Sequence, residues 1–214
     1  MTKKKGNETT AAGPGVSVWR ENVEAILIAV LLALFIRTFV VQAFKIPSGS
    51  MLDTLQIGDH ILVNKFAYGI DIPFLGIPLL PGKTPRRGDV IVFKYPNDPD
   101  KDYIKRVVGV GGDEIAVMNK QLFVNQKPVK EDYIIHTESR VQPVRDIFGP
   151  VRVPDHKLFV MGDNRDNSSD SRFWGFLDVD AVRGKAFLIY WSWNDRATSA
   201  FDRVRWSRIG DVVK

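Results

Sequence analysis

Two runs of residues decide the predicted fold: DVIVFKY (89–95) and YIKRVVGV (103–110). Both are short and rich in valine, isoleucine and aromatic residues, which is typical of β-strands. The same pattern recurs outward along the chain in HILVNKF (60–66), EIAVMN (114–119), QLFVN (121–125), KLFVMG (157–162) and KAFLIYW (185–191). Glycine-aspartate pairs beside several runs mark turns, and no convincing amphipathic helix separates them. The sequence therefore predicts a mainly β fold, an antiparallel β-barrel or sandwich.

The segment YGIDIPFLGIPLLPGKTP (68–85) departs from this pattern. It is apolar, but its proline and glycine content predicts neither a strand nor a helix. Two roles stay open for it. It could cover one end of the barrel, or it could dip into the surface of a lipid bilayer.

A long apolar segment precedes the predicted strands. Residues 1–18 are polar and predict a disordered basic tail. Every residue from Ala25 to Ile36 is apolar, and the flanks Trp19–Glu24 and Arg37–Val41 extend this segment to the roughly 20 residues that a membrane span needs. The sequence therefore predicts one N-terminal transmembrane helix over residues 19–41, followed by a β-rich domain over residues 42–214.

The three lysines at positions 3–5 orient the predicted anchor. Basic residues favour the cytoplasmic side, so the amino terminus is predicted inside and the β-rich domain outside. Two alternatives stay open. A buried helix of a soluble domain is disfavoured because no polar face interrupts residues 25–36. A cleavable signal peptide ending at Val41-Gln42-Ala43 is disfavoured because Arg37 lies between the apolar run and that site.

Composition excludes several functional classes. The chain has 214 residues and no cysteine, which excludes disulfides, thiol nucleophiles and cysteine-based metal sites. Its net charge of +5 combines a basic tail with a surface of mixed sign. A nucleic-acid binder would more often show one dense basic face with aromatic platforms, so no nucleic-acid partner is predicted.

The stretch FKIPSGSM (44–51) presents two serines on a turn directly after the predicted anchor. A serine nucleophile needs a base, and histidine is the usual one. The three histidines are scattered, have no metal-ligand spacing and accompany no Gly-x-Ser-x-Gly motif. A Ser-His-Asp triad and a metal site are therefore disfavoured.

A neutral lysine is the other base open to serine, and Lys105 in DYIKRVVGVGGD is the candidate. An ordinary lysine has a pKa of about 10.4, but burial can lower that pKa by up to about 3–5 units. Strand alternation directs Arg106 to the opposite face from Lys105. The competing interpretation of Lys105 is an ordinary solvent-facing residue.

The acidic stretch GDNRDNSSDSRFWG (162–175) suggests a calcium loop, but its spacing does not fit an EF-hand. The sixth and twelfth positions counted from Asp163 are serine and tryptophan, where glycine and glutamate are needed. Aspartate, asparagine and serine side chains also form hydrogen-bonded turns. The stretch is therefore predicted to be a self-bonded turn network that includes an Asp170–Arg172 pair.

Taken together and in this order, these stretches resemble the bacterial type I signal peptidases, membrane-anchored Ser-Lys endopeptidases that remove signal peptides from exported proteins. The matching segments are IPSGSM (46–51), GDVIVFKYPNDP (88–99), DYIKRVVG (102–109) and GDNRDNSSDSR (162–172). The resemblance runs from the anchor to about Trp191. Two departures are Asp53 and Gly111, which stand where the family commonly has proline.

The resemblance implies a role for each matching residue. Ser50 is expected to be the nucleophile and Lys105 the general base, with Ser48 and the Ser50 backbone forming the oxyanion hole. Ser168 is expected to orient the lysine, while Gly162, Asp170 and Arg172 brace the site. Apolar pockets for small substrate residues are expected from Phe44, Ile46, Met51, Leu55, Tyr103 and Ile104.

The resemblance also implies the reaction and its setting. The expected reaction is cleavage after an Ala-x-Ala-like site through an acyl-enzyme, with no metal or cofactor. The expected partners are signal peptides of exported preproteins and the lipid bilayer, with the secretion translocon as a transient neighbour. The implied location is the bacterial cytoplasmic membrane, with a single pass and the catalytic domain on the extracytoplasmic face.

Two rival functions stay open at this point. A Ser-Lys autoprotease of the SOS-repressor kind also places a serine before methionine, but such a protein would be cytoplasmic and bind DNA. A membrane-anchored β-domain that only binds extended peptides would not depend on Ser50 or Lys105.

Overall fold

The computed structural model describes the chain except for residues 1–17, 36–39, 72–77 and 200. The chain divides into two compact units, Met1–Thr38 and Phe39–Lys214. The described element of the first unit is helix α1 (Val18–Phe35). Within the described parts of the chain, no helix is both long enough and apolar enough to cross a membrane.

The predicted tail and anchor are only partly covered by this description. Residues 1–17 of the tail and residues 36–39 of the predicted anchor lie outside the described residues. Val41, which the sequence assigned to the end of the anchor, instead begins strand β1 because it pairs with Asn64 of β2. The transmembrane anchor stays a prediction.

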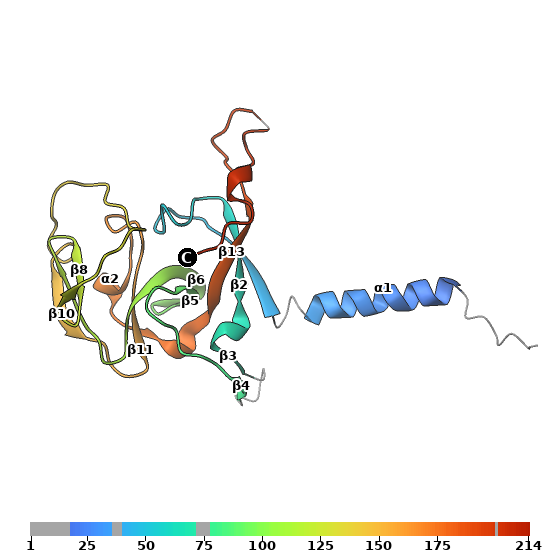
Figure 1. Ribbon diagram of the computed structural model, residues 1–214, viewed down its shortest axis with the longest axis horizontal. Helices are drawn as coiled ribbons and strands as arrows, with labels where there is room; N and C mark the ends of the chain where they lie inside the picture. The colour runs from blue at the N-terminus through green and yellow to red at the C-terminus, as the bar shows by residue number, and fades with distance from the viewer. Residues whose placement is uncertain (1–17, 36–39, 72–77, 200) are drawn as a thin grey trace, which may run out of the picture. The chain divides into compact units, whose positions relative to one another are not determined.

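A seven-stranded antiparallel sheet forms the frame of the second unit (Figure 1). Its strand order is β1-β2-β13-β5-β6-β11-β12. The bounds are β1 Val41–Lys45, β2 Asp59–Asn64, β13 Val182–Ser192, β5 Val90–Tyr95, β6 Asp98–Val110, β11 Lys157–Met161 and β12 Leu177–Asp178. The two runs that decided the predicted fold are thus adjacent strands, with Ile91 of β5 opposite Lys105 of β6.

A second antiparallel sheet of four strands has the order β10-β7-β8-β9. Its bounds are β7 Glu114–Met118, β8 Gln121–Val124, β9 Lys127–Pro128 and β10 Phe148–Arg152. Short helices complete the unit: η2 Lys65–Tyr68, α2 Ser171–Trp174, η3 Val179–Ala181 and η4 Trp206–Arg208. The mainly β prediction is confirmed, and each of the seven predicted runs contains a strand.

The structure narrows one detail of the predicted fold and corrects another. Of the two predicted alternatives, barrel and sandwich, the closed barrel is excluded, because the edge strands β1 and β12 of the main sheet do not pair with each other in the described part of the chain. The segment 68–85 also contains a two-stranded sheet, β3 Gly69–Asp71 and β4 Pro78–Pro81, where neither strand nor helix was predicted. Backbone pairing between these two short strands outweighs their proline and glycine content.

The core positions the segment that carries the serines. Ile46, Met51 and Leu55, from the loop between β1 and β2, are buried together with Ile61, Val63, Val90, Val92, Ala186, Ile189 and Val213. A second cluster joins Ile115 and Leu122 of the four-stranded sheet to Phe159 of the main sheet. Burying each such side chain stabilises the fold by about 1.5–3 kcal/mol. The loop between β1 and β2 (residues 46–58, called the serine loop below) and the four-stranded sheet are therefore firmly attached to the main sheet.

Candidate active site

Ser50 lies in a loop that the core holds at both ends. Ile46 donates its backbone N–H to Asp59 O (2.8 Å), and Gly58 donates to Ile46 O (2.9 Å), so the loop closes on itself where it meets β2. Met51 follows Ser50 directly and is fully buried. The core therefore fixes the backbone at Ser50 while leaving the Ser50 side chain at the surface of the loop.

Lys105 extends from β6 towards this loop. Its Nζ donates to Ser50 Oγ (2.8 Å) and to Ile104 O (2.9 Å). The side chain is almost completely buried, with 3% of its surface exposed. The lysine and the serine singled out in the sequence are thus in direct contact, although 55 positions separate them along the chain.

Burial lowers the pKa of Lys105 from 10.5 to about 8, because a charged ammonium is poorly solvated in this position. The negative charges of Asp170 and Asp163 act in the opposite direction and raise the pKa, but burial has the larger effect. With this pKa, about a tenth of Lys105 is neutral at pH 7 and about half at pH 8. A neutral amine has a free lone pair and can accept a proton.

Arg106 points to the other face of β6, as the strand alternation predicted. Its Nε and Nη2 donate to the two carboxylate oxygens of Asp163 (2.9 and 2.7 Å), and both side chains are buried. Thr54 Oγ1 donates to the same carboxylate (2.5 Å). This pair ties the serine loop, the lysine strand and the acidic stretch together, and sequence reasoning did not identify the pairing.

The predicted Asp170–Arg172 pair forms, but the acidic stretch is not bonded only to itself, because Asp163 and Asp166 pair with residues outside it. Arg172 Nε and Nη2 donate to the two oxygens of Asp170 (2.9 and 2.8 Å) in a buried bidentate pair. Asp170 also accepts a hydrogen bond from the backbone N–H of Gly162 (3.1 Å). Asp166 is paired with Lys120, whose Nζ lies 3.0 Å from Asp166 Oδ1. Each of the three aspartates in the acidic stretch is therefore paired with a basic side chain.

Gly162 permits a close approach between the acidic stretch and the serine loop. A Cβ at this position would lie 2.3 Å from Ser168 Oγ and 2.4 Å from Ser50 O, closer than real Cβ atoms come. Only a residue without a Cβ therefore fits here, and the bracing role expected of Gly162 stays a prediction. Ser168 Oγ is buried and has no hydrogen-bond partner among the described residues, so no hydrogen bond joins it to Lys105 here.

Ser50 and Lys105 line a cavity of about 380 Å³. Its other lining residues are Pro47, Ser48, Gly49, Asp102, Tyr103, Ile104, Asn167 and Ser169. Ser48, Tyr103 and Ile104 were predicted site residues, whereas Asp102, Asn167 and Ser169 were missed. These three lie within or beside the matching segments, so their position in the sequence was the available signal.

The structure places three predicted pocket residues differently. Ile46, Met51 and Leu55 are core residues with at most 2% of their surface exposed, and they do not line the cavity. Phe44 is partly buried and packs against the same core. The apolar character of these positions is explained by packing against β2 and β13, which no local sequence pattern separates from a substrate pocket.

The three histidines contact other parts of the structure. His60 Nδ1 lies 3.2 Å from Gly58 O, and the His60 ring packs edge-on against Tyr190. His136 contacts Asp166, and His156 contacts Asp180. The base in contact with Ser50 is therefore the lysine.

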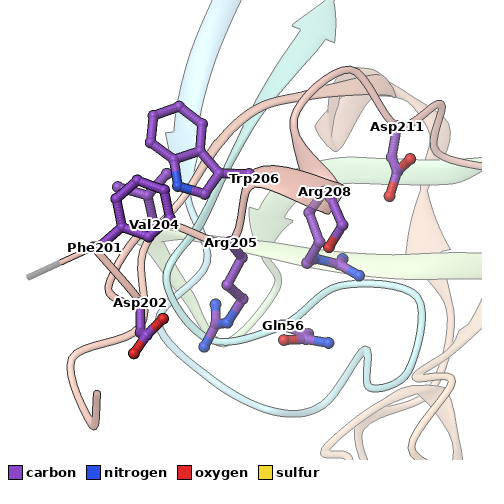
Figure 2. A pocket seen from close by; sticks show the side chains of 9 residues that line it. Gln56, Phe201, Asp202, Val204, Arg205, Trp206, Arg208 and Asp211 are labelled. Atoms are coloured by element: carbon purple, nitrogen blue, oxygen red, sulfur yellow. The ribbon is translucent and has the colours of Figure 1, made fainter. Parts of the chain in front are cut away.

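A larger cavity of about 560 Å³ lies at the carboxyl end of the described chain (Figure 2). Figure 2 shows Phe201 and Trp206 next to each other on its wall, and their ring centroids are 6.0 Å apart. Arg208 extends from the same wall and donates to Asp59 Oδ2 (2.6 Å). Neither Ser50 nor Lys105 lines this cavity, so cavity size does not identify the reactive site.

Comparison with known proteins agrees with the class that this site defines, a peptidase with a serine at its centre. Residues 19–191 match the family described as "Signal peptidase, peptidase S26". The chain belongs to this family of serine endopeptidases, the signal peptidase I family.

Similar curated proteins carry the corresponding name. Signal peptidase I of Pseudomonas aeruginosa is 38% identical over 85% of this chain and 75% of its own length. The probable signal peptidase I-2 of Synechocystis is 37% identical over 89% of this chain and 83% of its own. A crystal structure of a signal peptidase I from Enterococcus faecalis is 30% identical over 48% of this chain and 97% of its own, with a TM-score of 0.41.

Proposed function

We propose that this protein cleaves the signal peptides of exported preproteins, with Ser50 as nucleophile and Lys105 as general base. One observation carries the proposal: a buried lysine with a pKa of about 8 lies 2.8 Å from a serine hydroxyl. This is the contact that a Ser-Lys pair needs, since the base must lie within hydrogen-bond reach of the proton it accepts.

The proposed reaction is acyl transfer. Neutral Lys105 accepts the Ser50 proton through its lone pair while an N–H of the amine still donates to Ile104 O. Ser50 Oγ attacks the scissile carbonyl carbon, and the resulting ammonium gives its proton to the leaving amine of the mature protein. A water molecule then hydrolyses the acyl-enzyme, with Lys105 again as the base and Ser50 regaining its proton.

The negative charge on the carbonyl oxygen needs hydrogen-bond donors. We assign them to the Ser48 hydroxyl and the Ser50 backbone N–H, because both residues line the cavity beside Lys105. Loss of one such donor typically lowers the rate by about 10²–10³-fold. Ser168 is proposed to orient Lys105 during turnover, since its buried hydroxyl is unused by the described residues and lies against Gly162 beside the serine loop.

The substrate is proposed to bind as an extended strand along the cavity. Backbone hydrogen bonds would supply affinity, and shallow pockets would select small side chains, which gives preference for an Ala-x-Ala-like site. Tyr103 and Ile104 line the cavity and are the best placed of the predicted pocket residues. Phe44 stays a candidate at the border of the core, whereas Ile46, Met51 and Leu55 support the pocket only by packing beneath it.

Membrane attachment follows as a further part of the proposal. The apolar residues of α1 and the basic tail are proposed to anchor the chain in the bacterial cytoplasmic membrane, with the catalytic domain outside and the translocon nearby. Cell fractionation tests this part, since release of the whole chain in the soluble fraction would exclude the anchor and favour the autoprotease alternative.

The decisive experiment measures cleavage of a preprotein that carries an Ala-x-Ala site. Ser50→Ala and Lys105→Ala are each expected to lower kcat by at least about 10³-fold, since each removes a reacting group. Matched controls are Ser139→Ala and Lys101→Ala, because Ser139 is an exposed loop serine and Lys101 an exposed lysine of the same strand. Cleavage by Ser50→Ala and Lys105→Ala at the rate of the controls would exclude the Ser-Lys reaction. Absence of cleavage in the unchanged protein as well would favour a domain that only binds extended peptides.

A further inference from the structure

Asn164 brackets the residue that we propose as nucleophile. Its side-chain Nδ2 donates to Gly49 O (3.1 Å), and its backbone N–H donates to Ser50 O (3.1 Å). The carbonyl oxygens immediately before and at Ser50 are thus both held by one residue of the acidic stretch. Asn164 is 2% exposed and does not line the cavity.

The bond to Gly49 O controls more than the carbonyl. The Gly49–Ser50 peptide is not among the cis peptides of the described chain, so its C=O and N–H point in opposite directions within one plane. Nδ2 and a longer bond from Leu52 N–H (3.3 Å) together fix the direction of Gly49 O, and thereby also the direction of Ser50 N–H. That N–H is the backbone donor of the proposed oxyanion hole.

The segment around Asn164 is rigid enough to impose a direction. Asp163 before it is paired with Arg106, and Arg165 after it donates to both carboxylate oxygens of Glu131 (2.7 and 2.5 Å). The backbone is also pinned to a neighbouring segment, since Ile135 donates to Asp163 O (3.0 Å) and Arg165 donates to Ile135 O (3.1 Å). Buried pairs on both sides therefore hold the amide in place.

The other end of the side chain makes the choice of asparagine informative. Asn164 Oδ1 is buried and has no hydrogen-bond partner among the described residues. Burying an acceptor without a partner is unfavourable, so this cost offsets part of the stability that the Nδ2 bond to Gly49 O contributes. The amide cannot turn round to use Oδ1 instead, because two acceptor oxygens would then face each other at Gly49.

We infer that Asn164 is a positioning residue that aims the Ser50 backbone N–H into the oxyanion hole. It acts through the Gly49–Ser50 peptide and touches neither the substrate nor the reacting atoms. This inference rests on the proposed function, because it assigns a task to a donor that only that reaction needs.

The test compares Asn164→Leu with the unchanged full-length enzyme in preprotein cleavage. Leucine keeps roughly the same volume but removes the donor to Gly49 O. We expect kcat to fall by about 10- to 100-fold, less than complete loss of a donor, with KM within twofold. The pH midpoint of kcat should stay near that of the unchanged enzyme, because Asn164 makes no hydrogen bond to Lys105. Thermal unfolding should change little, because loss of the Nδ2 bond to Gly49 O and removal of the unpartnered Oδ1 act in opposite directions, and Leu52 N–H still donates to Gly49 O (3.3 Å).

Two further variants keep the test decisive. Asn164→Ala removes the same donor without any added bulk, so it must show the same loss of kcat if leucine disturbs the fold. Asn194→Leu is the control, because Asn194 bonds locally to the Arg196 N–H and lies away from the cavity. A kcat within twofold of the unchanged enzyme in a folded Asn164 variant would overturn the inference, as would a rise in KM that accounts for the whole loss.

Failure of this inference differs from failure of the proposed function. If Ser50→Ala and Lys105→Ala abolish cleavage while Asn164→Ala leaves kcat intact, the Ser-Lys reaction stands and the positioning role falls. If Ser50→Ala cleaves normally, the proposed function itself falls.

Discussion

Because Lys105 is buried, its charged form should lower the free energy of unfolding by an amount that depends on pH. The substitution Lys105→Met removes the charge and so measures this amount. The folded protein holds the pKa of Lys105 near 8, whereas the unfolded chain has the ordinary value of 10.5. The unfolded state therefore binds more protons between these two values, and stability rises with pH in this window. Below about pH 8 both states are protonated at this residue, and the full cost of burying the charge is present.

The size of this cost follows from the shift. With pKa values of 8 and 10.5, the cost is about 3 kcal/mol at pH 7 and falls to about 1 kcal/mol at pH 9.5. Methionine has a similar length and no titratable group, so it removes this cost at every pH. The stability advantage of Lys105→Met over the unchanged protein should therefore shrink by about 2 kcal/mol from pH 7 to pH 9.5. Differences in packing between the two side chains do not depend on pH and cancel in this comparison.

Urea unfolding followed by tryptophan fluorescence measures the free energy of unfolding at both pH values. Lys101→Met is the matched control on the same strand, and its effect should be flat between pH 7 and pH 9.5 because exposed Lys101 stays protonated in both states. Cleavage offers an independent measurement, since kcat/KM of the unchanged enzyme should rise about 50-fold from pH 6 to pH 8 as Lys105 becomes neutral. A stability difference for Lys105→Met that does not change with pH would refute the depressed pKa.

Two other substitutions test how the site is held together. Gly162→Ala should lower the free energy of unfolding by about 1–3 kcal/mol and reduce cleavage, because the added methyl group meets Ser50 O at 2.4 Å. Gly111→Ala is the control, and it should lower the thermal unfolding temperature less because its nearest neighbours lie at 3.2 Å. Asp163→Ala should lower the free energy of unfolding, measured in urea, by about 3–5 kcal/mol, because it leaves the Arg106 guanidinium buried without its partner. Adding Arg106→Met should recover part of that loss. If the double variant recovers nothing, the broken pair is not the cause of the loss.

The strands were predictable from sequence because valine-rich runs bounded by turns carry a local signal. The open edges of the main sheet were not predictable from sequence. They depend on whether β1 and β12 pair with each other, and no local pattern in either strand indicates its partner. Lys105 was a candidate base because of its apolar strand, but only the resemblance assigned it to Ser50, since composition and spacing do not bring together residues 55 positions apart. Met51 and Leu55 were expected to line a substrate pocket, but they are core residues. Their apolar side chains suit a pocket or a core equally well, and only their burial in one cluster with residues of β2 and β13 decides for the core.

The two buried arginines next to the site resolve an apparent conflict in its electrostatics. Asp163 and Asp170 lie close enough to raise the pKa of Lys105, which would work against a neutral base. Each of these carboxylates is instead held in a bidentate pair, by Arg106 and Arg172 respectively. A positive charge beside each carboxylate weakens the field of that carboxylate at a distance. Burial has the larger effect on the pKa of Lys105. Buried ion pairs are weak evidence for stability in general, and a role in holding the acids paired while bracing the acidic stretch explains better why two of them lie beside one lysine.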